Sequence, residues 1–166
     1  DYFHPDAGYQ LNILPKYLHK FGYEQTIITA EMEKFPKELT SFFGKENIAT
    51  CDEEYTRRYG VKILRLPIKT FISGRAVFGR SLYTAIKKEK PDLLYVHGND
   101  SFTGMQLLYH RKRFGCAIVT DSHMLAMASR NRFSKYFRAF YRRAITPFII
   151  KDQIPVIRTQ NDDYVQ

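Results

Sequence analysis

The fold is decided by two stretches, KPDLLYVHGND (Lys90–Asp100) and CAIVTDSHML (Cys116–Leu125), which flank a helical pattern. In each stretch a short run rich in Leu, Ile and Val is followed at once by polar residues. The runs are Leu93–Val96 and Ala117–Thr120. Runs of this composition are typical of strands covered on both faces, and two of them separated by a helix form a βαβ unit. The two stretches therefore predict a parallel sheet.

The same alternation continues on both sides of these stretches. Further strands are expected at Gln25–Thr29, Val61–Leu66 and Ile154–Arg158. Helices are expected at Leu11–Phe21, Pro36–Phe43, Asp52–Tyr59, Ser81–Lys90 and Ser101–Phe114, and a loop at Pro67–Phe78. The pattern predicts an α/β fold with a Rossmann-like, doubly wound, mostly parallel sheet, in a single domain over residues 1–166.

Composition excludes several classes of protein. The chain has 166 residues, of which 44% are hydrophobic and 26% charged, as in globular domains and unlike disordered or fibrous chains. No apolar run reaches the ~18 residues that span a bilayer. Cys51 and Cys116 lack metal-ligand spacing, so a reducing compartment is expected rather than a disulfide scaffold. Because residue 1 is Asp rather than Met, the chain is expected to be a fragment.

The net charge of +9 is local. Between Arg111 and Lys151 there are ten basic residues and a single acid, Asp121, so this stretch carries the whole excess. Within it, Phe133, Phe137, Phe140 and Ala144 are spaced to share one helical face, with Tyr136 and Tyr141 near its edges. The basic segment is defined by Arg130, Arg132, Lys135, Arg138, Arg142 and Arg143.

Three interpretations of this segment stay open. A basic amphipathic helix with aromatic residues suits an anionic membrane surface. The aromatic residues can instead face the core while the arginines are solvated, or the charges can bind nucleic acid, although no recognised nucleic-acid motif accompanies them.

Polar residues follow the strands at the edge where open parallel sheets bind ligands. Together with the loop before the first helix, these positions give the candidate site residues: His4, Gly8, Tyr9, His97, Asn99, Asp100, Asp121 and His123. Each has a plainer explanation as well. A histidine at a strand end can simply bond a loop carbonyl, and Asp100 can cap the helix that begins near Ser101. No metal is expected, because no ligand pair has the spacing of a helical zinc motif. A GxGxxG or P-loop motif is absent as well, so no dinucleotide cofactor is expected.

Three segments together resemble family 4 glycosyltransferases of the GT-B fold. DYFHPDAGYQLNILPKYLHKFGYEQTIIT (Asp1–Thr29) is similar to their opening, with a loop bearing Pro and Gly, a helix ending near L-x-x-x-G-H-E-V and a second strand. Lys90–Asp100 resembles their K-P-D strand with its trailing His, and Cys116–Leu125 resembles the next strand, whose loop carries a histidine. The chain departs from the family in three places. The first strand is missing before Asp1, Tyr9 replaces a second glycine, and Met124 follows His123 where an aspartate is usual.

The resemblance implies a retaining glycosyltransferase of the hexosyltransferase type. It would transfer a sugar from a nucleotide-sugar donor to a glycan or lipid-linked acceptor in polysaccharide or cell-envelope glycan synthesis. Residues 1–166 would be the N-terminal, acceptor-side half, inactive alone, with the donor-binding C-terminal domain absent from this chain. His123 would be catalytic, Gly8 and Tyr9 would approach donor phosphates, and His97, Asn99, Asp100 and Asp121 would line the acceptor side.

The resemblance also implies that no metal or cofactor is needed, and that the basic segment holds a cytoplasmic protein at the inner face of the membrane. Two other functions stay open from the residues alone. One is a noncatalytic basic α/β module that binds nucleic acid or anionic surfaces. The other is a different doubly wound enzyme with its site at His97 and His123.

Overall fold

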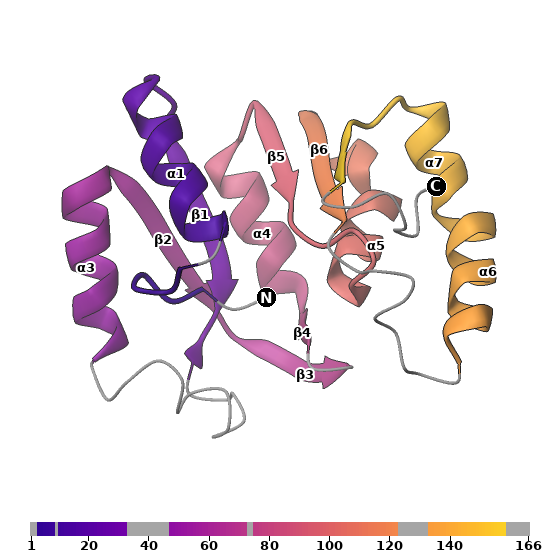
Figure 1. Cartoon of the computed structure of the whole chain (residues 1–166), viewed down its shortest axis with the longest axis horizontal. Coiled ribbons are helices and arrows are strands. Elements are labelled where there is room, and N and C mark those ends of the chain that lie inside the picture. The colour runs from indigo at the N-terminus through magenta and orange to yellow at the C-terminus, as the bar shows by residue number, and fades with distance from the viewer. Residues whose placement is uncertain (1–2, 9, 33–46, 73–74, 123–132, 159–166) are drawn as a thin grey trace. The chain divides into compact units, whose positions relative to one another are not determined.

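The computed structural model describes residues 3–8, 10–32, 47–72, 75–122 and 133–158 (Figure 1). The chain divides into two compact units, Asp1–Ala85 and Ile86–Gln166. A single domain over residues 1–166 stays a prediction. The predicted helix at Pro36–Phe43 lies outside the described residues.

The first unit is built on two parallel strands, β1 (Gln25–Ala30) and β2 (Val61–Leu66). Helices α1 (Gln10–Lys20) and α3 (Ile48–Tyr59) contact each other and β2. These packed elements bury Phe3, Tyr55 and Val61, and each large apolar side chain removed from water contributes roughly 1.5–3 kcal/mol.

Local signals set the bounds of α3. Asn47 precedes the helix, and its side-chain oxygen accepts a hydrogen bond from the backbone N–H of Ala49. Gly60 ends it in the left-handed conformation, with φ of 63°. The predicted helix at Asp52–Tyr59 therefore ends as expected and begins one turn earlier, because the capping residue is Asn47.

The loop predicted at Pro67–Phe78 is wrong. This stretch forms two antiparallel strands, β3 (Ile68–Ile72) and β4 (Arg75–Phe78), with Phe71 opposite Ala76. Both strands are short, and most of β3 is exposed while β4 is mostly buried. Pairing between the two strands, rather than the apolar pattern of either one, makes this segment a sheet.

The second unit is a three-stranded parallel sheet in the order β5, β6, β7. Its strands are Leu93–Val96, Ala117–Ser122 and Val156–Arg158, and its helices are α5 (Phe102–Tyr109), α6 (Ser134–Ala144) and α7 (Thr146–Lys151). The boundary between the units falls within α4 (Arg80–Glu89). Buried side chains from α5, α6, α7 and the segment before β7 form one core: Leu108, Tyr141, Ile145, Ile149 and Ile154.

The helix predicted at Ser101–Phe114 is too long. Ser101 caps α5 as expected, because its hydroxyl accepts the Gly104 N–H at 2.9 Å, but α5 ends at Tyr109 and a 3-10 turn, η3, covers Arg111–Arg113. The Arg111 guanidinium turns inward, donates to the Leu108 carbonyl at 3.1 Å and pairs with Asp152. The chain that makes these contacts continues as a 3-10 turn and not as an α-helix.

The predicted α/β, Rossmann-like fold is confirmed by these parallel strands and the helices that alternate with them. Four of the five predicted strands overlap β1, β2, β5 and β6 almost throughout, and the fifth is shortened to β7. Across the described ranges, no helix has both the length and the apolar character needed to cross a bilayer.

Candidate active site at the carboxyl ends of β5 and β6

The polar residues that follow β5 meet the end of β6. The two strands are in register, with Val96 opposite Thr120, and the Thr120 hydroxyl donates to the Val96 carbonyl at 2.7 Å. The backbone N–H of Asn99 then donates to the Asp121 carbonyl at 3.0 Å. The predicted convergence of His97 and Asn99 with Asp121 is therefore present in the fold.

Asp121 is the centre of this edge. Its carboxylate has no exposed surface. One oxygen, Oδ2, accepts the Tyr95 hydroxyl and lies 2.6 Å from Nδ1 of His97, while the other, Oδ1, accepts the Gly98 N–H at 2.6 Å. A buried carboxylate with several donors is strongly stabilised in its charged form.

The electrostatics agree with this geometry. Burial by itself would raise the pKa of the Asp121 carboxyl, but the hydrogen bonds from His97 and Tyr95, the charge of His97 and the Gly98 N–H lower it to about 2. Burial, followed by the hydrogen bond to Asp121, raises the pKa of Tyr95 well above its ordinary value. At neutral pH the edge thus holds a carboxylate anion and a neutral phenol.

Asn99 and Asp100 complete the turn between β5 and α5, and both are buried. Neither side-chain atom of Asn99 has a hydrogen-bond partner within the part of the chain that the structure describes. An unsatisfied buried amide costs about 1–3 kcal/mol. Among the described residues, the Asn99 carboxamide is therefore left able to bind a further polar group at this edge.

Close packing fixes the turn against α5. A Cβ atom added to Gly104 would lie 2.2 Å from the Gly98 carbonyl oxygen and 3.1 Å from the Asn99 Cα. Only glycine leaves room for this approach between the helix and the turn.

In the first unit, the loop of residues 3–8 is anchored by α1 and β2. The Asn12 carboxamide donates to the carbonyls of His4 and Pro5. Arg65 donates to the Phe3 carbonyl at 2.9 Å and holds Asp52 through two contacts of 2.6 and 2.7 Å. This partly buried ion pair fixes the loop at the carboxyl ends of β1 and β2.

Gly8 is exposed, and an added Cβ would meet no atom within 4 Å. Its expected approach to donor phosphates stays a prediction. His4 is buried, and its Nδ1 accepts the backbone N–H of Asp6, in its own loop, at 3.2 Å.

Three potential metal ligands lie near one another in this unit. One ligand atom each from His4, Asp6 and Cys51 fall within 4.8 Å of each other. A metal of the zinc type takes nitrogen, sulfur and carboxylate ligands. However, the Nδ1 of His4 already accepts a hydrogen bond, and the Asp6 side chain is 68% exposed. The group is a poor fit for a structural ion.

The aromatic residues of α6 divide between two faces. Phe137, Tyr141 and Ala144 pack on the core of the second unit. Phe133 and Tyr136 just before and within α6, with Phe140, are 57%, 75% and 52% exposed and stand three to four residues apart. The four residues predicted to share one helical face thus differ in burial: Phe137 and Ala144 lie against the core, whereas Phe133 and Phe140 are exposed.

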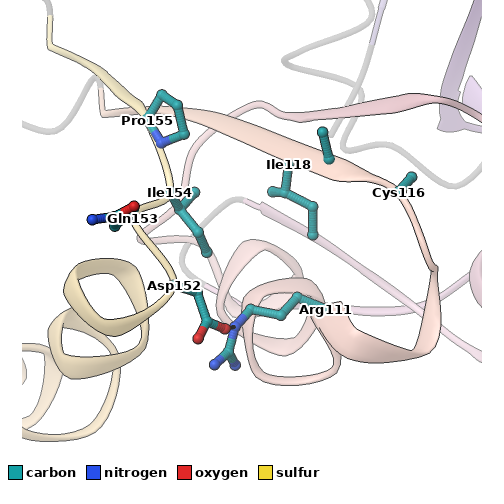
Figure 2. Close-up of a pocket in the computed structure, with 8 residues that line it drawn as sticks. Arg111, Cys116, Ile118, Asp152, Gln153, Ile154 and Pro155 are labelled. Atoms are coloured by element: carbon teal, nitrogen blue, oxygen red, sulfur yellow. Dashed lines mark hydrogen bonds and ion pairs between the residues drawn. The ribbon is translucent and has the colours of Figure 1, made fainter.

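A pocket of about 280 Å³ lies at the opposite edge of the sheet, where β6 begins (Figure 2). Arg111 and Asp152 line it as an ion pair, and the Arg111 guanidinium also lies 4.7 Å from the centre of the Phe148 ring. Arg111, the cation among the described lining residues, is held by these contacts. The candidate site is therefore placed at the carboxyl edge, where several polar residues converge.

Some predicted site residues cannot be placed. Tyr9, His123, Arg130 and Arg132 lie outside the described residues. Sequence reasoning missed Tyr95, whose only signal was a hydroxyl within an apolar strand. It also missed the backbone N–H of Gly98, for which the sequence carries no signal.

A family model described as Glycosyltransferase Family 4 matches residues 12–149. No curated protein and no solved structure matches the chain significantly.

Proposed function

The chain belongs to glycosyltransferase family 4, and from this premise we propose that it forms the acceptor-side domain of a retaining, hexosyltransferase-type enzyme. The proposed donor is a nucleotide-sugar and the proposed acceptor is a hydroxyl of a glycan or lipid-linked molecule, in polysaccharide or cell-envelope glycan synthesis. In the transfer, the bond between the anomeric carbon and the nucleoside diphosphate breaks, and a bond to the acceptor oxygen forms with the same configuration. The acceptor hydroxyl gives its proton to the departing diphosphate.

One observation carries the acceptor-side assignment. His97, Asn99, Asp100 and Asp121 converge at the carboxyl ends of β5 and β6, as ligand sites of open α/β sheets do. A hydroxyl both donates and accepts, so it can satisfy the Asn99 carboxamide. We assign His123 to the cleft beside the transferred sugar and Gly8 with Tyr9 to the donor phosphates.

We further propose that a second Rossmann-like domain binds the donor, that residues 1–166 alone do not turn over, and that no metal or cofactor takes part. The weak fit of His4, Asp6 and Cys51 to an ion supports the last statement.

The proposed location is the cytoplasm, at the inner face of the membrane. The helix that carries the exposed aromatic residues also carries Lys135, Arg142 and Arg143, which are exposed too. Aromatic rings at headgroup depth with flanking basic residues are typical of interfacial helices.

The test is a transfer assay on the natural gene product that contains this domain, with nucleotide-sugars and lipid-linked or glycan acceptors. His123→Ala and His97→Ala are expected to lower kcat/KM by tenfold or more. His110→Ala is the matched control, because His110 caps the far end of α5. Near-normal transfer by His123→Ala would remove its catalytic assignment. No transfer with any donor, together with RNA or vesicle binding, would favour the noncatalytic basic module.

A further inference from the structure

We infer that Arg65 is a positioning residue, which together with Asp52 holds the loop of residues 3–8 in place for the donor phosphates. The inference rests on the proposed function, in which Gly8 at the end of this loop approaches those phosphates. Arg65 lies on β2 and Asp52 on α3, and their side chains are 13% and 16% exposed. The Arg65 guanidinium contacts three separate parts of the first unit.

All three guanidinium nitrogens of Arg65 are engaged. Nε and Nη2 donate to the two carboxylate oxygens of Asp52, at 2.6 and 2.7 Å. Nη2 also donates to the Phe3 carbonyl at 2.9 Å, and Nη1 donates to the Ala30 carbonyl at 3.1 Å. These four bonds use four of the five N–H donors that a guanidinium carries. Arg65 therefore joins the loop to the end of β1 and to α3.

Asp52 fixes the direction in which Arg65 donates. A carboxylate that binds a guanidinium through two parallel hydrogen bonds holds this planar group in one orientation. The same pairing neutralises the positive charge, and each guanidinium nitrogen already has a partner within the described residues. Arg65 is thus well suited to hold backbone carbonyls and poorly suited to bind a phosphate itself.

A second side chain holds the same loop from α1. Asn12 is 2% exposed, and its carboxamide donates to the carbonyls of His4 and Pro5. The backbone carbonyl of Asn12 in turn accepts the Tyr55 hydroxyl from α3 at 2.8 Å. The carbonyls of three successive residues, Phe3, His4 and Pro5, are therefore all bound by side chains of the surrounding elements.

The anchored carbonyls precede the glycine that the proposed function places near the donor. Gly8 is exposed, and it follows a turn in which the Ala7 N–H donates to the His4 carbonyl at 3.1 Å. A loop that is ordered before its ligand arrives loses less conformational entropy when the ligand binds. Loss of the Arg65 contacts is therefore expected to weaken donor binding without removing a donor contact.

The first measurement is the mobility of the loop, read as 15N order parameters of the His4, Asp6 and Ala7 amides in the 166-residue chain without substrate. We expect about 0.85 in the wild type, as for a rigid backbone, and about 0.6 or lower in Arg65→Lys. Lysine keeps the charge but cannot make the same fork of hydrogen bonds. The matched control is Arg57→Lys, the same change at an exposed position of α3, which should leave the loop unchanged.

A wild-type loop with order parameters of about 0.6 or lower overturns the inference, and this result needs no variant to fold. The inference is also overturned if Arg65→Lys folds and its loop is as rigid as in the wild type. If Arg65→Lys does not fold, Asp52→Asn is judged by the same criterion, because a carboxamide has one accepting oxygen and no negative charge.

The second measurement is the transfer assay of the natural gene product, with donor and acceptor concentrations varied separately. Arg65→Lys and Asp52→Asn should each lower kcat/KM for the donor about tenfold or more and change KM for the acceptor by less than about twofold. The double variant should be no slower than the slower single variant, because both changes break one contact set. Arg57→Lys should match the wild type.

The two single variants also separate positioning from a direct phosphate contact. If Arg65 bound the donor phosphates itself, Asp52→Asn would strengthen donor binding, because it removes the carboxylate that neutralises the guanidinium. Stronger donor binding in Asp52→Asn, or equal losses for donor and acceptor, would overturn the inference. An unchanged donor kcat/KM in a variant with a mobile loop would overturn the link to the donor. A wild type that turns over no donor contradicts the proposed function, whereas the order parameters still decide whether Arg65 positions the loop.

Discussion

Asp121 is a charged side chain with no exposed surface. Because its carboxylate accepts its hydrogen bonds in the folded chain, the free energy of unfolding depends on whether this carboxyl is protonated. Its pKa of about 2 in the folded chain lies below the ordinary value of 3.8. A depressed carboxyl pKa adds stability above the unfolded value, and that stability is lost as pH falls through the folded value. The gain corresponds to about 2 kcal/mol.

Asp121→Asn is therefore expected to lower the free energy of unfolding by about 1–3 kcal/mol at pH 7, and by progressively less as the pH falls from about 4 toward 2. Urea unfolding at a series of pH values measures this. Asp92→Asn changes an exposed carboxyl at the start of β5 and serves as the control. A gap between wild type and Asp121→Asn that stays constant down to pH 2 would contradict the prediction.

Part of the site could be predicted from single residues. His97, Asn99 and Asp121 were found because polar side chains directly follow apolar runs, and strand ends place such residues together. The sequence could not show that Asp121 is buried beneath the others, because burial depends on which donors the fold supplies. The Tyr95 hydroxyl and the Gly98 N–H are two such donors.

Helix α5 supports the site through the contact of Gly104 with the Gly98–Asn99 turn. Replacing a helical glycine by alanine ordinarily stabilises a protein by roughly 1 kcal/mol. Here the opposite sign is expected, because the new Cβ would lie 2.2 Å from a backbone oxygen. Gly104→Ala should lower the free energy of unfolding by about 1–3 kcal/mol.

Thermal and urea unfolding measure this change, and amide chemical shifts of Gly98 and Asn99 report whether the turn moves. Gly8→Ala is the matched control, because its added Cβ would meet no atom within 4 Å. A stabilised Gly104→Ala variant with unshifted amides would show that the turn does not require this glycine.

Elements with strong local signals were predicted closely. The strands at Val61–Leu66 and Leu93–Val96 have the predicted bounds, since apolar runs ended by polar residues or glycine leave few alternatives. The hairpin of β3 and β4 and the end of α5 were missed. The hairpin depends on the pairing of its two strands, such as Phe71 with Ala76, which neither apolar pattern shows by itself. The end of α5 depends on a contact distant in sequence, the ion pair of Arg111 with Asp152.

At the scale of the whole molecule, the segment with the excess of basic residues also carries three exposed aromatic residues. The charge excess lies in Arg111–Lys151, although Arg111 is itself buried and paired with Asp152. The structure leaves Phe133, Tyr136 and Phe140 exposed. A solvated basic face alone would not require exposed aromatic rings, so their coincidence favours an anionic lipid surface over a purely structural helix.

Vesicle co-sedimentation tests this proposal with the 166-residue chain. Binding is expected to anionic vesicles and not to neutral ones, and to weaken as salt rises, because each basic residue near the surface contributes roughly 1 kcal/mol before screening. We expect binding to weaken about tenfold or more in the double variant Arg142→Gln with Arg143→Gln. We expect it to weaken at every salt concentration in the double variant Tyr136→Ser with Phe140→Ser.

The charge-matched control is the double variant Lys87→Gln with Lys88→Gln, which changes two exposed lysines at the end of α4. If the control variant loses as much vesicle affinity as the Arg142 and Arg143 variant, net charge alone drives binding. If binding depends neither on lipid charge nor on either pair of α6 substitutions, α6 is not the membrane-facing surface.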